Sequence, residues 1–459
     1  MANAARRLAI GLLVVLAWNL AWPALGQNDQ WYEVSKAGLR AVDKGELREA
    51  ERLFREALRL SDAFSEDDPR RATSVNNLAY ILHAQGRYLA AEPHYREALA
   101  MREAALGPDH PDVAQSANNL AELYRELGRY DEAEKLHRRA LAIREKHFGP
   151  DHPDVAQSLN NLGVLYAGRG RYAEAEPLYQ RALEIRARSY GENHPTTAET
   201  RNNLATLFYA QGRYAEAKPL YEQALAVEER TLGPDHPSLA VTLSNLAELE
   251  RIEGDIDEAV RLHERALKIR EAALGPSHPE TAQSLNNLAV ALFDRAVAAG
   301  SGDDADKKDG QIKADFARAE ELYQRSVAIK EAALGANHPE LALTLNNLAE
   351  LYRVQRRFDE ALPLYERALA IEERSFGPDH PTLALGLNNL ALLHYDRGAY
   401  IKAEPLLRRA LAIEEKALGP DNRELITTLE NYAAVLRELR RYDEADKLEA
   451  RANTLRAQL

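Results

Sequence analysis

The chain has 459 residues and no cysteine. Without cysteine there can be no disulfide, no lipid-modified cysteine and no thiolate metal site. The motifs of several enzyme classes are also missing, including the phosphate-binding GxxxxGK, the zinc-binding HExxH and the hydrolase motif GxSxG. No stretch outside the repeats described below is long enough for a catalytic domain. We therefore predict that the chain is not an enzyme and needs no cofactor.

The chain has fewer basic than acidic residues. The chain has 59 Lys and Arg against 72 Asp and Glu, which gives a formal net charge of −13. Binding to nucleic acid through its phosphates needs a basic surface. The composition therefore disfavours nucleic acid and favours a basic or neutral protein or peptide partner, and nothing in the sequence indicates a small-molecule substrate.

The N-terminal segment 1–26 has the pattern of an export signal. Two arginines precede an apolar core from Leu8 to Trp18, and small residues lead up to Gly26. We expect cleavage after Gly26 and a protein that is exported, either periplasmic or secreted. The alternative is an uncleaved membrane anchor, but Asn19 and Pro23 interrupt the apolar run before it reaches the roughly 20 residues of a spanning helix. Membrane attachment is expected only in that case.

A pattern that returns every 42 residues organises the rest of the chain. The glycine that closes each unit occurs at Gly107, Gly149, Gly191, Gly233 and Gly275, then 60 residues later at Gly335, and again at Gly377 and Gly419. A fixed period of this length is typical of a solenoid of stacked units. The longer step indicates an insertion of 18 residues in one unit.

These boundaries predict one continuous all-α solenoid. Its parts are a signal peptide at 1–26, an N-terminal capping pair of helices at 27–68, repeats at 69–295, a flexible insertion at 296–315, repeats at 316–422 and a C-terminal capping repeat at 423–459. The insertion is rich in glycine and charge, so we expect a mobile loop projecting from one edge between two lengthened helices. Its one resemblance to a calcium loop fails, because Ala305, Lys307 and Phe316 would stand where ligands are needed.

Each unit reads as two helices. In the unit that follows Gly107, Pro111 suits the first position of a helix, and Gly128 suits a left-handed helix end. A histidine precedes the proline in seven units, at His110, His152, His194, His236, His278, His338 and His380. One histidine per unit is too sparse to share a metal ion, so we predict turn residues whose imidazole caps a helix.

The order Leu120, Ala121, Tyr124, Gly128, Tyr130, Ala133 and Ala140 resembles the tetratricopeptide repeat, a helix-turn-helix unit of about 34 residues. The longer period, with LGPDHP, LNNLA and EAEPLYQRALEI, resembles the repeats of kinesin light chains and their bacterial relatives. The coiled-coil segment of kinesin light chains is absent, so the motor role is not implied. The resemblance implies a right-handed superhelical α-solenoid whose first helices line a concave face that contacts ligands.

Two columns of asparagine run along the first helices. The second Asn of each unit is Asn77, Asn119, Asn161, Asn203, Asn245, Asn287, Asn347, Asn389 and Asn431. Asn is a poor helix former, so its recurrence needs a cause. The functional hypothesis is a ladder of amides that binds the main chain of an extended peptide in the groove, through Asn77 to Asn389. The alternative is that one Asn of each unit bonds to a neighbouring helix and fixes the superhelix, which we favour for the first column.

Specificity would come from the residues three and six positions after the second Asn, which differ between units. Tyr209, Phe293 and Tyr395 are aromatic candidates for ligand anchors. Charged pairs stand at the same two positions in three units, at Glu122 and Arg125, Glu248 and Arg251, and Glu350 and Arg353. These are equally well explained as ordinary ion pairs on a solvated helix.

The sequence therefore predicts an exported interaction scaffold that binds an extended peptide or protein segment in the concave groove. The alternative is a structural platform within a cell-envelope or export complex that acts through its outer face and insertion loop.

Overall fold

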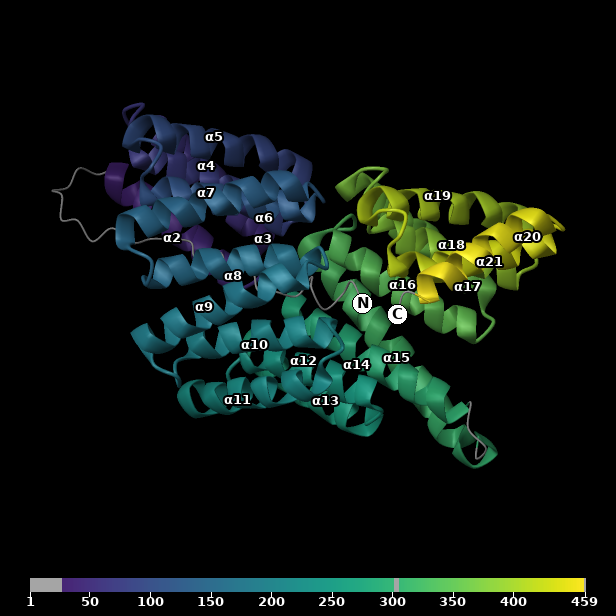
Figure 1. The fold of residues 1–459 in the computed structure, drawn as a ribbon. Coiled ribbons are helices and arrows are strands. Elements are labelled where there is room, and N and C mark those ends of the chain that lie inside the picture. Colours follow the sequence, from purple (N-terminus) through teal and green to yellow (C-terminus); the bar gives the residue numbers. More distant parts are fainter. Residues whose placement is uncertain (1–26, 301–304, 458–459) are drawn as a thin grey trace. The chain divides into compact units, whose positions relative to one another are not determined.

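The computed structural model describes residues 27–300 and 305–457, and the predicted signal peptide lies outside them. Across these residues the chain is helical, without a β-strand, and from α2 to α14 and again from α16 to α21 each α-helix packs beside the next one along the chain (Figure 1). The all-α prediction is confirmed. The chain divides into two compact units, residues 1–312 and 313–459, where the sequence predicted one continuous solenoid.

The helices follow one another in pairs. Unit 1 contains α2 (Gln27–Asp43) and α3 (Leu47–Ser61), α4 (Pro69–Ala84) and α5 (Tyr88–Leu106), α6 (Pro111–Glu126) and α7 (Tyr130–Phe148), α8 (Pro153–Gly168) and α9 (Tyr172–Tyr190), α10 (Pro195–Ala210) and α11 (Tyr214–Leu232), α12 (Leu239–Glu253) and α13 (Ile256–Leu274), and α14 (Pro279–Gly300). The boundary between the units falls within α15 (Ala305–Leu334). Unit 2 continues with α16 (Pro339–Val354) and α17 (Phe358–Phe376), α18 (Leu383–Asp396) and α19 (Tyr400–Leu418), the short 3₁₀ helix η1 (Arg423–Leu425), and α20 (Ile426–Glu438) and α21 (Tyr442–Ala457).

The insertion is more helical than the sequence suggested. Residues 296–300 belong to α14 and residues 305–315 to α15. The predicted flexible segment 296–315 therefore included residues that are helical. The expected lengthening of both flanking helices is confirmed, because α14 has 22 residues and α15 has 30.

The histidines before the prolines cap helices, as predicted. In each case Nδ1 accepts a hydrogen bond from the backbone N–H two residues later, at 3.2–3.3 Å, and this holds for His110, His152, His194, His236, His278, His338 and His380. At the same place in two flanking pairs, Asp68 and Asn422 cap through a side-chain oxygen. These bonds satisfy a backbone donor that the first turn of a helix leaves without a partner.

Two helices begin later than the prolines predict. α12 starts at Leu239 and α18 at Leu383, although Pro237 and Pro381 stand where other pairs begin. The N–H of Ala240 bonds to the carbonyl of Pro237 at 3.1 Å, three residues back instead of four. The first turn of this helix is therefore tighter than an α-helical turn.

Alanine and large side chains alternate in the packed interior. In α9, Ala175, Tyr179 and Ala182 are fully buried, and Tyr95 of α5 and Tyr221 of α11 occupy the place of Tyr179 in two other second helices. The small residues let helices approach closely enough to enclose these rings. A single helical pair could not bury these tyrosine rings without its neighbours.

A column of cations links each second helix to the next first helix. Arg102, Arg144, Arg186, Arg270 and Lys330 each donate to a backbone carbonyl ten residues on and to a Ser or Thr hydroxyl fourteen residues on. Three pairs have glutamate at this position instead, at Glu228, Glu372 and Glu414. Burial raises the pKa of Glu228 to about 7, against a smaller opposing effect of the Thr242 hydroxyl.

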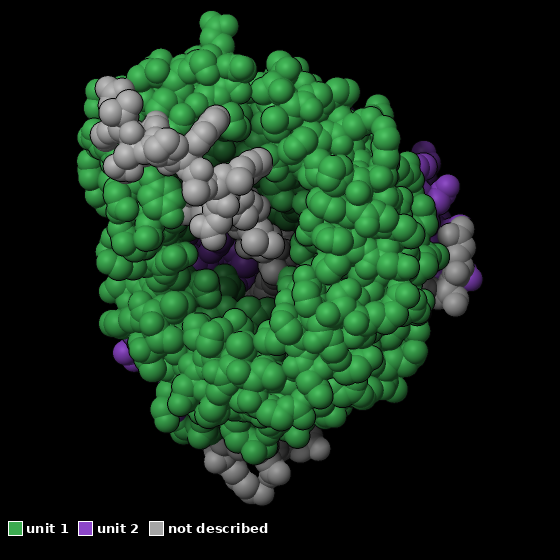
Figure 2. Space-filling view, turned by 90° about the vertical axis from the view of Figure 1, so that its left-hand side faces the viewer, with its two compact units in different colours: residues 1–312 green, residues 313–459 purple. Residues whose placement is uncertain are grey.

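Unit 1 curves with its first helices on the inside. The first helices of neighbouring pairs contact each other, from α4 and α6 through α12 and α14, in addition to the contacts that every helix makes with the next. The space-filling view shows the atoms of unit 1 around a central hollow (Figure 2). Side chains on the inner surface of the first helices are therefore placed around this hollow.

We expect His110→Ala to lower stability by about 0.5–2 kcal/mol, because the first turn of α6 loses its cap. His110→Asn should retain most of the stability, since Asn422 caps at the same place in the last pair. Urea unfolding followed by circular dichroism measures both variants. Equal losses for Ala and Asn would show that the cap contributes nothing.

Glu228→Gln should stabilise the protein at pH 8, by on the order of 2 kcal/mol. The carboxyl has a raised pKa in the folded state, so its contribution to stability is greatest below 4.5 and is lost as the pH rises towards about 7. The variant should therefore show a weaker fall in unfolding midpoint between pH 5 and pH 8 than the unchanged protein. The same fall in both proteins would contradict the assignment.

Candidate protein-binding surface

The inner face of the first helices gathers the side chains that the sequence singled out. We define it as the second asparagine of each pair together with the residues three, six and seven positions after it. The asparagine and the residues three and six positions after it were predicted, and the residue seven positions after it was identified in the structure.

The asparagines form bonds between successive pairs. Nδ2 of the second Asn donates to Oδ1 of the first Asn in the preceding pair, from Asn119 to Asn76 at 2.9 Å, from Asn203 to Asn160 at 2.8 Å and from Asn245 to Asn202 at 3.1 Å. In unit 2 the same bond runs from Asn431 to Asn388 at 3.0 Å. Both columns therefore take part in fixing the stack, which is the alternative that the sequence left open.

Other contacts occupy the amide oxygens of the second column. Oδ1 of Asn119, Asn161 and Asn287 accepts a hydrogen bond from a glutamine four residues earlier, at 2.8–2.9 Å. Of the predicted peptide-binding amides, Asn77, Asn119, Asn203 and Asn287 are buried, and Asn161, Asn245, Asn347 and Asn389 are half-buried. Binding of a peptide main chain by these residues stays a prediction, and it is best supported at the half-buried ones.

Each charged pair on the inner face has a second carboxylate. Arg125 Nε lies 2.9 Å from Glu122 Oε2, and the same guanidinium forms an ion pair with Glu126. In the α12 pair, Arg251 lies 3.2 Å from Glu248 and 2.8 Å from Asp294, which comes from α14. We call each set of two carboxylates around one arginine an acidic rung.

Unit 2 has an acidic rung of the same construction. Arg353 lies 2.7 Å from Glu350 and forms an ion pair with Asp396 of the next first helix. Glu126, Asp294 and Asp396 were not among the predicted site residues, although all three stand seven residues after a second asparagine.

Side chains from the second helices support the rungs from behind. His137 is fully buried, with Nε2 3.3 Å from Glu122 and Nδ1 2.9 Å from Asn118 Oδ1. Burial by itself would raise the pKa of Glu122, but Arg125 and His137 outweigh it and hold that pKa at about 2. The side chain of Arg125 is only 12% exposed, so this pair is more enclosed than an ordinary ion pair on a solvated helix.

The predicted aromatic anchors are all half-buried. The ring of Tyr209 lies 5.6 Å from that of Tyr214, and the ring of Tyr395 lies 5.3 Å from that of Tyr400, so both pack against the start of the following helix. Phe293 is half-buried on α14. Their role as ligand anchors stays a prediction. A more exposed apolar residue on the same face, Ile252 at 43%, was missed by the sequence analysis.

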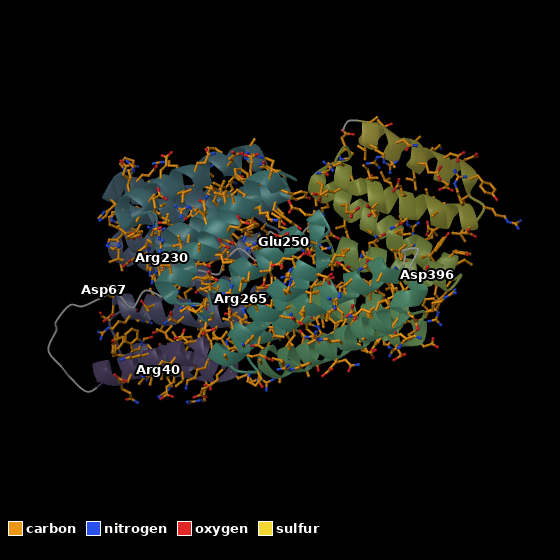
Figure 3. The ribbon with its side chains drawn as sticks, turned by 90° about the horizontal axis from the view of Figure 1, so that it is seen from below. Arg40, Asp67, Arg230, Glu250, Arg265 and Asp396 are labelled. Carbon is orange, nitrogen blue, oxygen red and sulfur yellow. The ribbon has the colours of Figure 1, made fainter. Side chains whose placement is uncertain are left out.

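Arginines of the second helices also link neighbouring pairs, as in Arg265 with Glu229 at 2.6 Å and Arg409 with Glu373 at 2.5 Å. Arg265 is labelled in Figure 3, which draws the side chains over the ribbon. Arginines at the turns meet two carboxylates, as Arg213 does with Glu176 and Glu216, so such sets are not confined to the inner face.

Within the described part of the chain, no three His, Cys, Asp or Glu side chains are grouped so that they could hold a metal ion. No helix in these residues is both long and apolar enough to cross a membrane.

The repeat geometry agrees with the sequence profile of the tetratricopeptide repeat family, which matches in nine overlapping stretches: 37–104, 70–146, 118–188, 154–228, 202–272, 238–296, 311–371, 340–415 and 382–457. The chain belongs to this family. The predicted family resemblance is therefore confirmed for the tetratricopeptide repeat. No curated protein matches the chain.

Several solved tetratricopeptide repeat structures are similar to the chain. A Podosopora anserina protein with nearly identical kinesin light chain TPR-like repeats is 25% identical over 46% of this chain and 99% of its own, with a TM-score of 0.39–0.40. BtubC (BKLC) from P. vanneervenii is 27% identical over 55% of this chain and 94% of its own, with a TM-score of 0.40. Human IFIT1, solved as a dimer with PPP-AAAA, is 14% identical over 96% and 97%, with a TM-score of 0.52, and shares the fold alone.

We expect Asn203→Ala to destabilise the protein by about 1–3 kcal/mol, because Asn160 Oδ1 is left buried without its donor. Asn161→Ala is the matched control, since its amide accepts only a local bond from Gln157. In a double-mutant cycle the losses from Asn160→Ala and Asn203→Ala should not add. Additive losses in the unfolding midpoints would contradict a direct bond between the pairs.

Proposed function

We propose that the protein is an adaptor that binds an extended segment of another protein against the inner face of unit 1. One observation carries this proposal. The residues that pack the pairs together keep their type, whereas those three and six positions after the second asparagine change from pair to pair on one helical face. At the first of these positions stand Tyr80, Glu122, Val164, Thr206, Glu248 and Val290. At this first position part of the variation is matched within the pair, because Glu122 meets His137 and Thr206 bonds to Tyr221. The residues six positions after the asparagine, from Arg125 to Phe293, are half-buried, and variation at such positions is typical of a surface that reads a ligand.

The family supports the kind of partner. Tetratricopeptide repeat proteins generally bind protein or peptide ligands, and helices that pack roughly 10 Å apart match about three residues of an extended chain. The half-buried amides of Asn161 and Asn245 could then bond to the ligand main chain at regular steps. The net charge of −13 favours a protein over a nucleic acid as partner.

Export is part of the proposal and rests on the sequence of residues 1–26 alone. On that basis we place the adaptor in the periplasm or outside the cell. The second candidate function is a structural platform in an envelope complex. It is favoured by the lengthened helices α14 and α15, which extend beyond the regular repeat.

Photocrosslinking distinguishes the two functions. A benzophenone amino acid placed at Tyr209 on the inner face should form adducts with a partner protein, and mass spectrometry should locate the adduct in one continuous segment. The matched positions are Leu89, 61% exposed on a second helix, and Tyr190, 46% exposed near a turn. Adducts from Leu89 or Tyr190 but none from Tyr209 would favour the platform and contradict the adaptor.

A further inference from the structure

The two ends of unit 1 meet. A Cβ atom added to Gly45, in the turn between α2 and α3, would lie 2.9 Å from side-chain atoms of both His278 and Pro279 at the start of α14. The first pair therefore contacts the seventh. The six steps from the first pair to the seventh therefore run around the hollow in Figure 2.

This closure places the acidic rungs opposite each other. The rung of Glu122, Arg125 and Glu126 belongs to the third pair, and that of Arg251 and its two carboxylates to the sixth pair and the start of the seventh. Three steps out of six are half a turn. A segment that enters the hollow thus has one rung on each side of it.

The two rungs are negative. Each contributes two carboxylates and one guanidinium, so its net charge is −1 when all three groups are ionised. Asp43 at the end of α2 stands near the inner-face residue Tyr80, whose pKa it raises in addition to the larger effect of burial.

Behind one rung, the amide of Asn118 is only partly used. Asn118, 3% exposed, directs Oδ1 to His137, and its Nδ2 is buried without a hydrogen-bond partner. That donor is enclosed and does not reach a ligand. The amide of Asn161 in the next pair is half-buried, so its Nδ2 can donate to a carbonyl oxygen of a bound main chain.

We propose that the hollow of unit 1 takes a basic extended protein segment whose Lys or Arg side chains contact the two opposed acidic rungs. This rests on the proposed adaptor function and adds the charge of the ligand. The cation replaces the missing positive charge at each rung, and the half-buried Tyr209 between the rungs contacts an uncharged side chain of the segment. Complementary charge of this kind speeds association and excludes acidic segments.

The test measures fluorescence anisotropy of labelled peptides with the full chain at low salt. The probe is oligolysine of about ten residues, which spans roughly 33 Å when extended. Oligoglutamate and a Gly-Ser peptide of the same length are the controls. We expect oligolysine to bind, with an affinity that falls as salt is added, and the other two peptides to bind at least tenfold more weakly.

The variant Glu126→Gln with Asp294→Asn should weaken oligolysine binding about tenfold or more. The matched control is Asp131→Asn with Asp257→Asn. These carboxylates lie on the second helices α7 and α13, are 82% and 79% exposed, and each also pairs with an arginine of the next helical pair. Both double variants lose two negative charges, so non-specific attraction to the acidic protein falls equally. Equal weakening by the two would overturn the proposal.

A second pair of variants tests the same surface without removing any contact of a rung. Ile252→Lys should weaken oligolysine binding and Ile252→Glu should strengthen it, because this exposed side chain stands beside Arg251 on the inner face. Leu89→Lys and Leu89→Glu make the same charge changes on the outer surface and should have little effect. Similar effects at both positions would overturn the proposal even if the first variants fold poorly.

The outcomes separate this inference from the adaptor function. Crosslinks from Tyr209 to a neutral or acidic segment, together with no preference for oligolysine, would overturn the basic ligand and leave the adaptor standing. Failure of Tyr209 to crosslink any partner would overturn both.

Discussion

The packing of each helical pair against its neighbours is the interaction on which the rest of the structure depends. Tyr95, Tyr179 and Tyr221 are almost completely buried. Each lies on a second helix, and the first helix of its own pair covers it on only one side. The next pair covers the remaining surface. Stability of such an array is a sum of contacts between neighbours, so the apolar positions must keep their size from pair to pair. This constraint leaves few positions free to vary.

Polar groups adjust how the neighbours meet. The histidine caps stabilise the start of a first helix. Buried cations such as Arg144 and Arg186 bond that start to the preceding second helix. The asparagines bond one first helix to the next. Bonds on the inner side shorten the distance between first helices. The array therefore curves, and in unit 1 the curvature is sufficient to bring Gly45 against His278.

Curvature changes what the charged residues can do. Along a straight rod, the rungs at Arg125 and Arg251 would be separate features on one surface. Around the hollow of unit 1 they lie half a turn apart, with an excess of carboxylate at each. Arginines at the turns, such as Arg213 with Glu176 and Glu216, carry the same excess, but the rungs stand where a bound segment would be most enclosed. In such an enclosed place, charges are less screened by solvent.

The sequence by itself determined the helical pairs, their boundaries at residues such as Pro111 and Gly128, the histidine caps and the family, because these depend on local backbone preferences and on a period that can be counted. It also placed Glu122 and Arg125 on one helical face. Only the tertiary structure decided that Asn203 bonds to Asn160, that Arg251 meets Asp294 and that the first pair reaches the seventh. Those contacts join residues 43 or more positions apart, and their geometry follows from the small rotation between neighbouring pairs, which no single repeat encodes.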